Sequence, residues 1–381
     1  MNTDDYVRQM PDASADLARR VSLWQRIHID LPLLILLLAL TVFGLLVLYS
    51  ASGQKAASVI RQAGYFVVGY AAMFVMAQIK VQQYQRWAPW LYVVGILLLA
   101  GVLYLGTGAK GAQRWLSIGS FRFQPSEILK LMVPLTVAWY LSSRVLPPRF
   151  KYVVISLLLV GLPGALIVLQ PDLGTALIII TSGLIVLFMS GLGWWYLMGA
   201  IGIAVASAWP AWQFMLHDYQ KQRILTLLDP ERDKLGAGWN IIQSKTAIGS
   251  GGWDGKGWLQ GTQSRLDFLP ESHTDFIIAV LGEEFGLRGI LLLVFVYLLV
   301  VFRGLWIGLH AQDSFGRLVA GSITLTFFVY VFVNMGMVSG LLPVVGVPLP
   351  LISAGGTSLV TLLGGFGVLM AVSTDTRLLR Q

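Results

Sequence analysis

The sequence predicts an all-α, polytopic membrane protein: a bundle of ten transmembrane helices with one large extracytoplasmic loop. Only 12% of its 381 residues are charged, about half the share of roughly 25% that is usual in soluble domains. Hydrophobic residues make up 56%, and the mean hydropathy is +0.72. So few charges could not cover the surface of a soluble globule. The absence of cysteine excludes disulfide scaffolds and thiolate metal centres.

The apolar residues are arranged in long continuous runs, which is a further observation in favour of membrane helices. A helix needs about 20 mostly apolar residues to cross a bilayer. The runs cover residues 31–50, 62–79, 89–106, 125–142, 152–170, 173–191, 195–215, 275–302, 318–340 and 357–374. Because the backbone must satisfy its own hydrogen bonds in lipid, each run is predicted to be a helix.

The basic residues of the tails and short loops predict the orientation of these helices. If the N-terminus is cytoplasmic, thirteen Lys and Arg residues lie on the inner side and five on the outer side. This asymmetry predicts that both termini are cytoplasmic. The net charge of +8 is therefore interpreted as an orientation signal. No nucleic-acid partner is expected, since no basic stretch carries interleaved aromatic residues.

The chain divides into a tail and a membrane domain. Residues 1–29 are polar and mixed in charge, unlike a signal peptide, and form a predicted cytoplasmic tail. Residues 30–381 form the predicted ten-helix membrane domain. Within it, residues 216–273 form an outer loop of roughly 60 residues between the seventh and eighth runs, and loops of such length are usually functional.

Charged residues inside the predicted spans are functional candidates, because burying charge in a membrane is costly. They are Glu127, Lys130, Asp275, Glu283, Glu284 and Arg288. Glu127 and Lys130 are three residues apart and share a helix face, either as a structural ion pair or as part of a polar cavity for an anionic ligand. Glu284 and Arg288 are four apart and are predicted to neutralise each other, whereas Glu283 has no obvious local partner.

Asp275 begins the eighth run, directly after the long loop. A half-desolvated carboxylate at that membrane edge has the chemistry of a general base. An aspartate at the start of a helix can equally be an N-cap. Its position alone leaves both interpretations open.

Several strings of the sequence resemble one family. They are residues 123–127 (FQPSE) with Lys130, 170–174 (QPDLG), 268–276 (FLPESHTDF), 282–286 (GEEFG) and 348–358 (PLPLISAGGTS). In this order, on ten predicted spans, they resemble the SEDS family (shape, elongation, division and sporulation), which are peptidoglycan glycosyltransferases. Residues 238–244 (GWNIIQS) and 257–261 (GWLQG) are most similar to the elongation, or rod-shape, members.

The resemblance implies roles for particular residues. Asp275 matches the family's catalytic base, and Glu127 and Lys130 match a pair that shapes the substrate cavity. The other positions expected at this cavity are Arg122, Asp172, Gln220, Arg223, His273, Ser353 and Thr357. No metal ligand is implied; a divalent cation is left open as a cofactor.

The implied activity is the polymerisation of lipid II into β-1,4 glycan strands during cell-wall elongation, in the bacterial cytoplasmic (inner) membrane. Undecaprenyl pyrophosphate would be the leaving group. The implied partners are a class B penicillin-binding protein, which is a transpeptidase, and other membrane proteins of the elongation complex. Two alternatives remain open: a flippase for lipid-linked precursors, and a non-catalytic scaffold for the transpeptidase.

Overall fold

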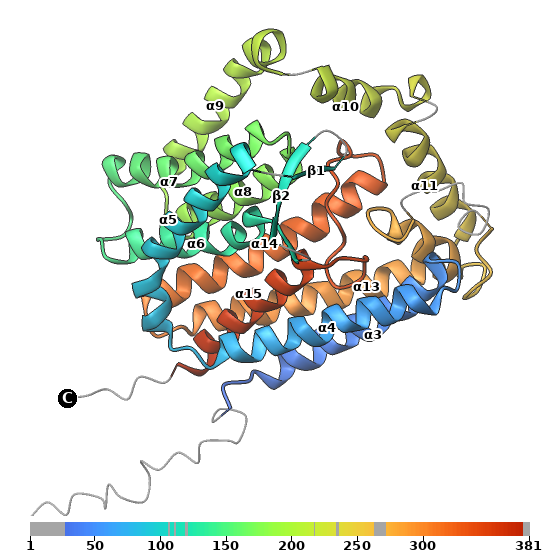
Figure 1. The fold of residues 1–381 in the computed structure, drawn as a ribbon, viewed down its shortest axis with the longest axis horizontal. Coiled ribbons are helices and arrows are strands. Elements are labelled where there is room, and N and C mark those ends of the chain that lie inside the picture. Colours follow the sequence, from blue (N-terminus) through green and yellow to red (C-terminus); the bar gives the residue numbers. More distant parts are fainter. Residues whose placement is uncertain are drawn as a thin grey trace, which may run out of the picture.

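The structure, a computed structural model, describes residues 27–105, 107–109, 112–118, 121–216, 218–233, 236–262 and 272–375. Most of the predicted tail 1–29 thus lies outside the described residues. The described part is a bundle of long helices, with shorter helices across one end (Figure 1).

The long helices follow the apolar runs of the sequence. In chain order they are α3 (Leu31–Ala51), α4 (Ala56–Ala77), α5 (Val81–Leu105), α6 (Pro125–Ser142), α7 (Phe150–Leu169), α8 (Leu173–Met189), α9 (Trp194–Pro210), α13 (Ile277–Leu309), α14 (Ser314–Val338) and α15 (Thr357–Thr374). Within the described residues, seven of them are long and apolar enough to cross a membrane: α3, α4, α5, α7, α13, α14 and α15. Helix α8 is apolar but has 17 residues. The predicted helical membrane class is confirmed.

Two segments have more structure than the sequence predicted. Between α5 and α6, three short strands form an antiparallel sheet in the order β1-β2-β3: β1 (Thr107–Ala109), β2 (Ala112–Ile118) and β3 (Phe121–Phe123). In the sequence, each connection between them is short and contains a glycine, as is common in hairpins. The long loop contains helices α10 (Asp218–Leu228) and α11 (Ala237–Gly251) and a 3₁₀ turn, Pro230–Arg232.

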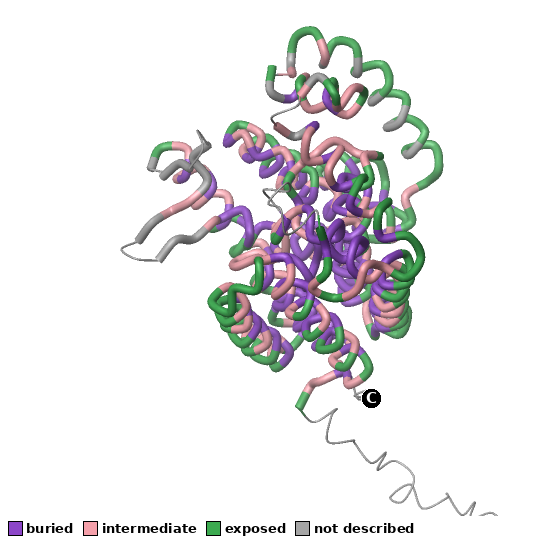
Figure 2. The backbone as a smooth tube through the Cα atoms, turned by 90° about the vertical axis from the view of Figure 1, so that its right-hand side faces the viewer, coloured by how far each residue is buried: buried purple, intermediate pink, exposed green. Residues whose placement is uncertain are grey.

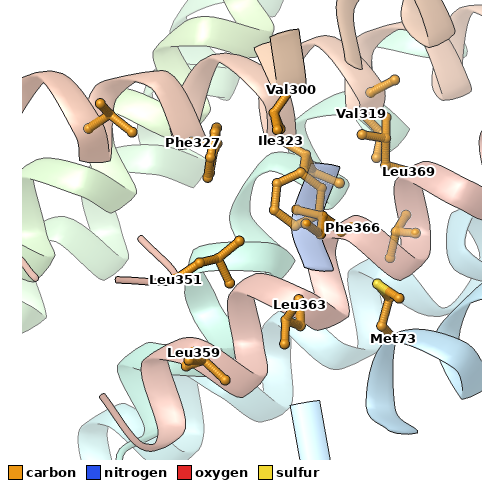
Figure 3. Packing of buried hydrophobic residues seen from close by; sticks show 14 of the residues in the cluster. Met73, Val300, Val319, Ile323, Phe327, Leu351, Leu359, Leu363, Phe366 and Leu369 are labelled. Atoms are coloured by element: carbon orange, nitrogen blue, oxygen red, sulfur yellow. The ribbon is translucent and has the colours of Figure 1, made fainter. Parts of the chain in front are cut away.

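The core lies where α4, α13, α14 and α15 meet. Phe327 and Phe366 pack edge to face, with ring centroids 5.2 Å apart, and Leu363 and Met73 belong to the same buried cluster (Figure 3). Small residues allow this close packing, since a Cβ on Gly367 would clash with the carbonyl of Met73. Buried residues fill the centre of the bundle, and many residues on its outside are exposed (Figure 2). Many of these are large and apolar, as expected for helices that face lipid.

Asp30 joins three helices at one end of the bundle. Its carboxylate caps α3 by accepting from the Leu33 N–H (3.1 Å), and it accepts from both Nε (3.0 Å) and Nη2 (2.7 Å) of Arg303 on α13. The Ser373 hydroxyl on α15 donates to it at 2.8 Å. Burial raises the pKa of Asp30, but these hydrogen bonds outweigh burial and hold the pKa below its usual value. The start of α3 and the end of α15 therefore lie at the same end of the bundle; the opposite end is called the outer end below.

Asp30→Asn is expected to lower the midpoint of thermal unfolding in detergent at neutral pH, at a cost of about 1–3 kcal/mol. Because the folded-state pKa is lowered, the charged form stabilises the fold above the unfolded pKa, and this contribution is lost as the pH falls through the folded pKa. The difference from the wild type should therefore shrink below about pH 4. Asp254→Asn, in an exposed pair with Arg288, is the control and should have little effect. Equal midpoints for Asp30→Asn and wild type at pH 7 would contradict the prediction.

Candidate functional site

A polar cavity of about 490 Å³ lies at the outer end of the bundle. Its walls come from the first turns of α6, α8 and α15, from α14 and from the segment before α15. Four of the residues predicted for the site line it: Glu127, Lys130, Asp172 and Thr357. The fold therefore brings together residues that are far apart in the sequence.

Glu127 and Lys130 form a buried ion pair in the cavity wall. The Lys130 ammonium lies 2.7 Å from Oε1 of Glu127, as expected for residues three apart on a helix. It also donates to the Ser358 hydroxyl at 3.2 Å and lies 5.7 Å from the centre of the Tyr330 ring. Oε2 of Glu127 is buried and has no hydrogen-bond partner among the described residues. The pair thus crosslinks helices and also presents a cation to the cavity.

Three helices begin at the cavity. Asp172 caps α8 by accepting from the Thr175 N–H at 3.3 Å, and its other oxygen accepts from the Gln124 amide, also at 3.3 Å. Helix α15 starts after Gly356 without a side-chain cap, and α6 starts after Gln124 without one. Helix N-termini carry partial positive charge and free N–H groups. Asp172 and Glu127 offset this charge at the starts of α8 and α6, so the groups that suit an anionic ligand are Lys130 and the start of α15.

Asp275 lies beside this cavity, in the turn that precedes α13. The helix begins two residues later, at Ile277, and its N-cap is Phe276, so Asp275 is not the cap. Asp275 is half-buried. Its Oδ2 lies 3.6 Å from the position that a Cβ on Gly346 would occupy, and Gly346 lines the cavity. The carboxylate therefore adjoins the cavity wall.

The other predicted residues lie around or outside the cavity. Ser353 is buried and lines a small adjoining cavity of about 30 Å³, while His273 is exposed and is not among the lining residues. Gln220 and Arg223 lie on α10, and neither lines the cavity. Arg122 lies in β3, where its backbone pairs with Ser117; its side chain is outside the described residues.

Several lining residues had no signal in the sequence. Tyr65 on α4, Tyr330 on α14 and Gly346 are single residues in otherwise ordinary segments. Gln124 lies in one of the family strings, and that string was the available signal for it. Only the packing of distant segments brings these side chains to one cavity.

The predicted neutralisation of Glu284 by Arg288 is wrong. Gly286 has φ 64° and ψ −164°, which breaks α13 between the two residues, so the spacing of a regular helix does not apply. Arg288 instead pairs with Asp254, and Glu284 accepts from the Ser50 hydroxyl. Glu283 does have a partner, but a distant one: Lys256, at 2.7 Å.

A segment of the long loop is inserted at this break. In a regular helix the N–H groups of Leu287 and Arg288 would donate to the carbonyls of Glu283 and Glu284. Here Leu287 and Arg288 donate to the carbonyls of residues 252 and 253 at 2.9 and 3.2 Å. The carbonyls of Glu283 and Glu284 accept from the N–H groups of residues 256 and 257 at 3.0 and 2.9 Å. The loop thus satisfies the groups that the break leaves open.

Gly286→Ala is expected to destabilise the protein strongly. A positive φ with extended ψ is nearly restricted to glycine and costs other residues about 1–3 kcal/mol. A Cβ there would also clash with the Gly255 N–H and lie 2.6 Å from the Trp253 carbonyl. Gly161→Ala on α7 is the control, because a Cβ there meets nothing within 4 Å. Thermal unfolding of both variants checks this, and equal midpoints for the two would contradict it.

The fold and the cavity define a class: multi-pass membrane proteins with a cation-bearing polar cavity beside a carboxylate. Residues 31–378 match the model of the FtsW/RodA/SpoVE family, described as cell cycle proteins. The chain is 53% identical over 367 residues to the peptidoglycan glycosyltransferase MrdB of Escherichia coli, a match that covers 96% of this chain and 99% of the relative. It is 38% identical to FtsW of Trichlorobacter lovleyi, named a probable peptidoglycan glycosyltransferase, over 92% and 94% of the two chains.

Solved structures agree with these relatives. A chain from a peptidoglycan synthase complex, described as structurally coordinating polymerization and crosslinking, matches with a TM-score of 0.81 and 31% identity over 91% of this chain and 98% of that one. The rod shape determining protein RodA of Thermus thermophilus matches with a TM-score of 0.69 and 28% identity, over 91% and 97%. The chain belongs to the FtsW/RodA/SpoVE family. The predicted family and the predicted class, a peptidoglycan glycosyltransferase, are confirmed.

Proposed function

We propose that this protein polymerises lipid II into β-1,4 glycan strands during cell-wall elongation, with Asp275 as the general base. One observation carries the proposal: a cavity with a buried ammonium and the uncapped start of α15 adjoins a half-buried carboxylate. Such a site can bind a pyrophosphate and deprotonate a hydroxyl in one place.

The anionic part of the substrate is proposed to bind near Lys130 and the start of α15. Free N–H groups at a helix N-terminus bind phosphate well, and Thr357 is the first residue of α15. Preorganised positive charge at this position would stabilise the charge that develops on the departing pyrophosphate. Glu127 and Asp172 would hold Lys130 and the start of α8 in place, respectively.

The transfer step requires one base. Asp275 takes the proton from the 4-hydroxyl of the acceptor sugar, and the resulting oxygen attacks the anomeric carbon of the donor. The bond from that carbon to the pyrophosphate breaks, and undecaprenyl pyrophosphate leaves with the electron pair. Attack from the opposite face converts an α-linked donor into a β-linked product. A pyrophosphate is a good leaving group, so a second carboxylate that acts as an acid, as in glycoside hydrolysis, is not needed.

The remaining predicted residues are proposed to act around the cavity. Arg122, Gln220 and Arg223 would contact the parts of lipid II that extend beyond it, and His273 would lie at its edge. Ser353 would support the cavity from its buried position next to it. A divalent cation would be a further source of positive charge; the described residues contain no group of three His, Asp or Glu that could hold one, so no step is assigned to it.

The proposed topology has ten spans in the bacterial inner membrane, formed by residues 30–381, with residues 1–29 as a cytoplasmic tail. The shorter helices α6, α8 and α9 would complete the count. Hydrogen bonding of Asp30 to Ser373 supports both termini on one side, which is cytoplasmic by the distribution of basic residues. Residues 216–273 would then lie on the outer side.

The proposed partner is a class B penicillin-binding protein, together with other membrane proteins of the elongation complex. An apolar cavity of about 430 Å³ supports this, because it lies between α13 and α14 and is lined by residues such as Ile278, Val294 and Phe332. A single apolar helix of the transpeptidase would fit against such a surface. The related chain from a peptidoglycan synthase complex also supports it.

The proposed function is tested by incubating the purified protein with lipid II in detergent, with and without the transpeptidase. Glycan strands longer than the starting disaccharide are expected on gels. Movement of lipid II across the membranes of vesicles that contain the same purified protein separates a flippase from a polymerase. Translocation without polymerisation would overturn the proposal.

The structure does not favour the flippase. A polar path through the membrane would need Glu283 and Glu284. Glu283 instead pairs with Lys256 of the inserted loop, and Glu284 accepts from the Ser50 hydroxyl.

A further inference from the structure

Three consecutive carbonyl groups next to the proposed base are each held by a hydrogen bond. The His273 carbonyl accepts from the Ala354 N–H at 2.9 Å. The Thr274 carbonyl accepts from the Ser353 hydroxyl at 2.5 Å, and the Asp275 carbonyl accepts from the Asn334 amide at 2.9 Å. The backbone that carries the carboxylate is thus fixed from two sides, by α14 and by the segment before α15.

Asn334 links this turn to the wall of the cavity. It is fully buried on α14, and the same Nδ2 that donates to Asp275 also donates to the Val347 carbonyl at 2.7 Å. Val347 lines the cavity next to Gly346, against which the Asp275 carboxylate lies. One amide therefore ties the backbone of Asp275 to the backbone of the cavity wall.

The other end of the Asn334 side chain indicates that its donors are the important groups. Its Oδ1 is buried and has no hydrogen-bond partner among the described residues. A buried acceptor without a partner is unfavourable, and an apolar residue of similar size would avoid that cost. A local cost of this kind is expected where function requires the residue.

Ser353 has a matching role on the other side of the turn. Its hydroxyl donates to Thr274 and accepts from the Leu349 N–H at 2.9 Å, so it joins the turn to its own segment. Gln62 on α4 also holds the segment before α15, because its side-chain oxygen accepts from the Gly355 N–H at 3.1 Å.

We propose that Asn334 and Ser353 are positioning residues for glycosyl transfer: they hold the backbone of residues 273–275 so that the Asp275 carboxylate meets the acceptor hydroxyl at the cavity wall. This inference rests on the proposed function, in which Asp275 is the base. A displacement of about 1 Å in a reacting group can cost about 100-fold in rate. Loss of either donor should therefore slow the transfer step and leave substrate binding largely intact.

The test compares the steady-state kinetics of lipid II polymerisation across five variants, with kcat expressed per folded protein. Asn334→Leu and Ser353→Ala are expected to lower kcat about 10–100-fold, with KM for lipid II within about twofold of the wild type. Ser353→Thr and Ser353→Val add the same volume, but only threonine retains the hydroxyl, so threonine should keep at least about tenfold more activity. Ser322→Ala is the control: it removes another buried donor of α14, to the Ser182 carbonyl, and should leave kcat unchanged.

The outcomes separate this inference from the proposed function. If Asp275→Asn retains activity, the proposed base is wrong. If Asp275→Asn is inactive while Asn334→Leu and Ser353→Ala keep kcat within about twofold of the wild type, the positioning inference is wrong. Equal activity of Ser353→Thr and Ser353→Val also overturns it. If Asn334→Leu does not fold, the three Ser353 variants alone test the positioning inference.

Discussion

Asp275→Asn is expected to give a folded, membrane-inserted protein that no longer polymerises lipid II. An amide has nearly the shape of a carboxylate but cannot accept the proton of the acceptor hydroxyl. General-base catalysis typically accelerates a reaction about 10²–10⁴-fold, so the rate of polymerisation should fall at least about 10²-fold. The fold should survive because Asn334 contacts the backbone of residue 275 rather than its side chain.

The rate of polymerisation by purified Asp275→Asn is measured with radiolabelled or fluorescent lipid II. Asp313→Asn is a matched control: Asp313 caps α14 by accepting from the Gly316 N–H at 2.7 Å, and asparagine caps helices equally well. It should therefore keep full activity. Glycan strands of normal length from monodisperse Asp275→Asn would refute the assignment of the base.

Lys130→Met is expected to reduce both stability and activity. It removes the cation from the cavity and leaves Glu127 buried without its ion-pair partner. Breaking a buried pair from one side costs about 3–5 kcal/mol. Removing one electrostatic contact to the developing charge costs about 10²–10³-fold in rate.

The double variant Glu127→Gln with Lys130→Met separates the structural from the functional role of this pair. It leaves no unpaired charge, so it should recover most of the thermal stability lost in Lys130→Met. It should not recover polymerisation if Lys130 binds the pyrophosphate. Arg288→Met with Asp254→Asn, an exposed pair, is the control and should retain both properties. Full activity of the first double variant would show that the pair is structural only.

Local features of the sequence predicted the helices and one ion pair. Continuous apolar runs determine membrane helices, because in lipid the backbone has no partner but itself. The spacing of Glu127 and Lys130 determined their contact, since both lie on one unbroken turn of α6. The strings around Asp172 and Asp275 identified the family, although no local rule placed Asp275 beside the cavity that Asp172 lines.

The same spacing argument failed for Glu284 and Arg288. Their helix is broken at Gly286 by a segment that follows α11 in the chain. Nothing local to residues 282–288 predicts that residues 252–257 will supply their hydrogen bonds. Glycine in a helical run is tolerated at modest cost, so Gly286 alone did not mark a break.

The sequence by itself thus determined the class of protein, the helices and the chemical groups available to it. The tertiary structure alone decided which of those groups meet: Lys130 with Ser358, Asn334 with the turn before α13, and the Asp275 carboxylate with the cavity wall at Gly346. The physical reason is that helix formation depends on contacts between near neighbours in the chain. A catalytic cavity instead depends on the packing of helices that are up to hundreds of residues apart.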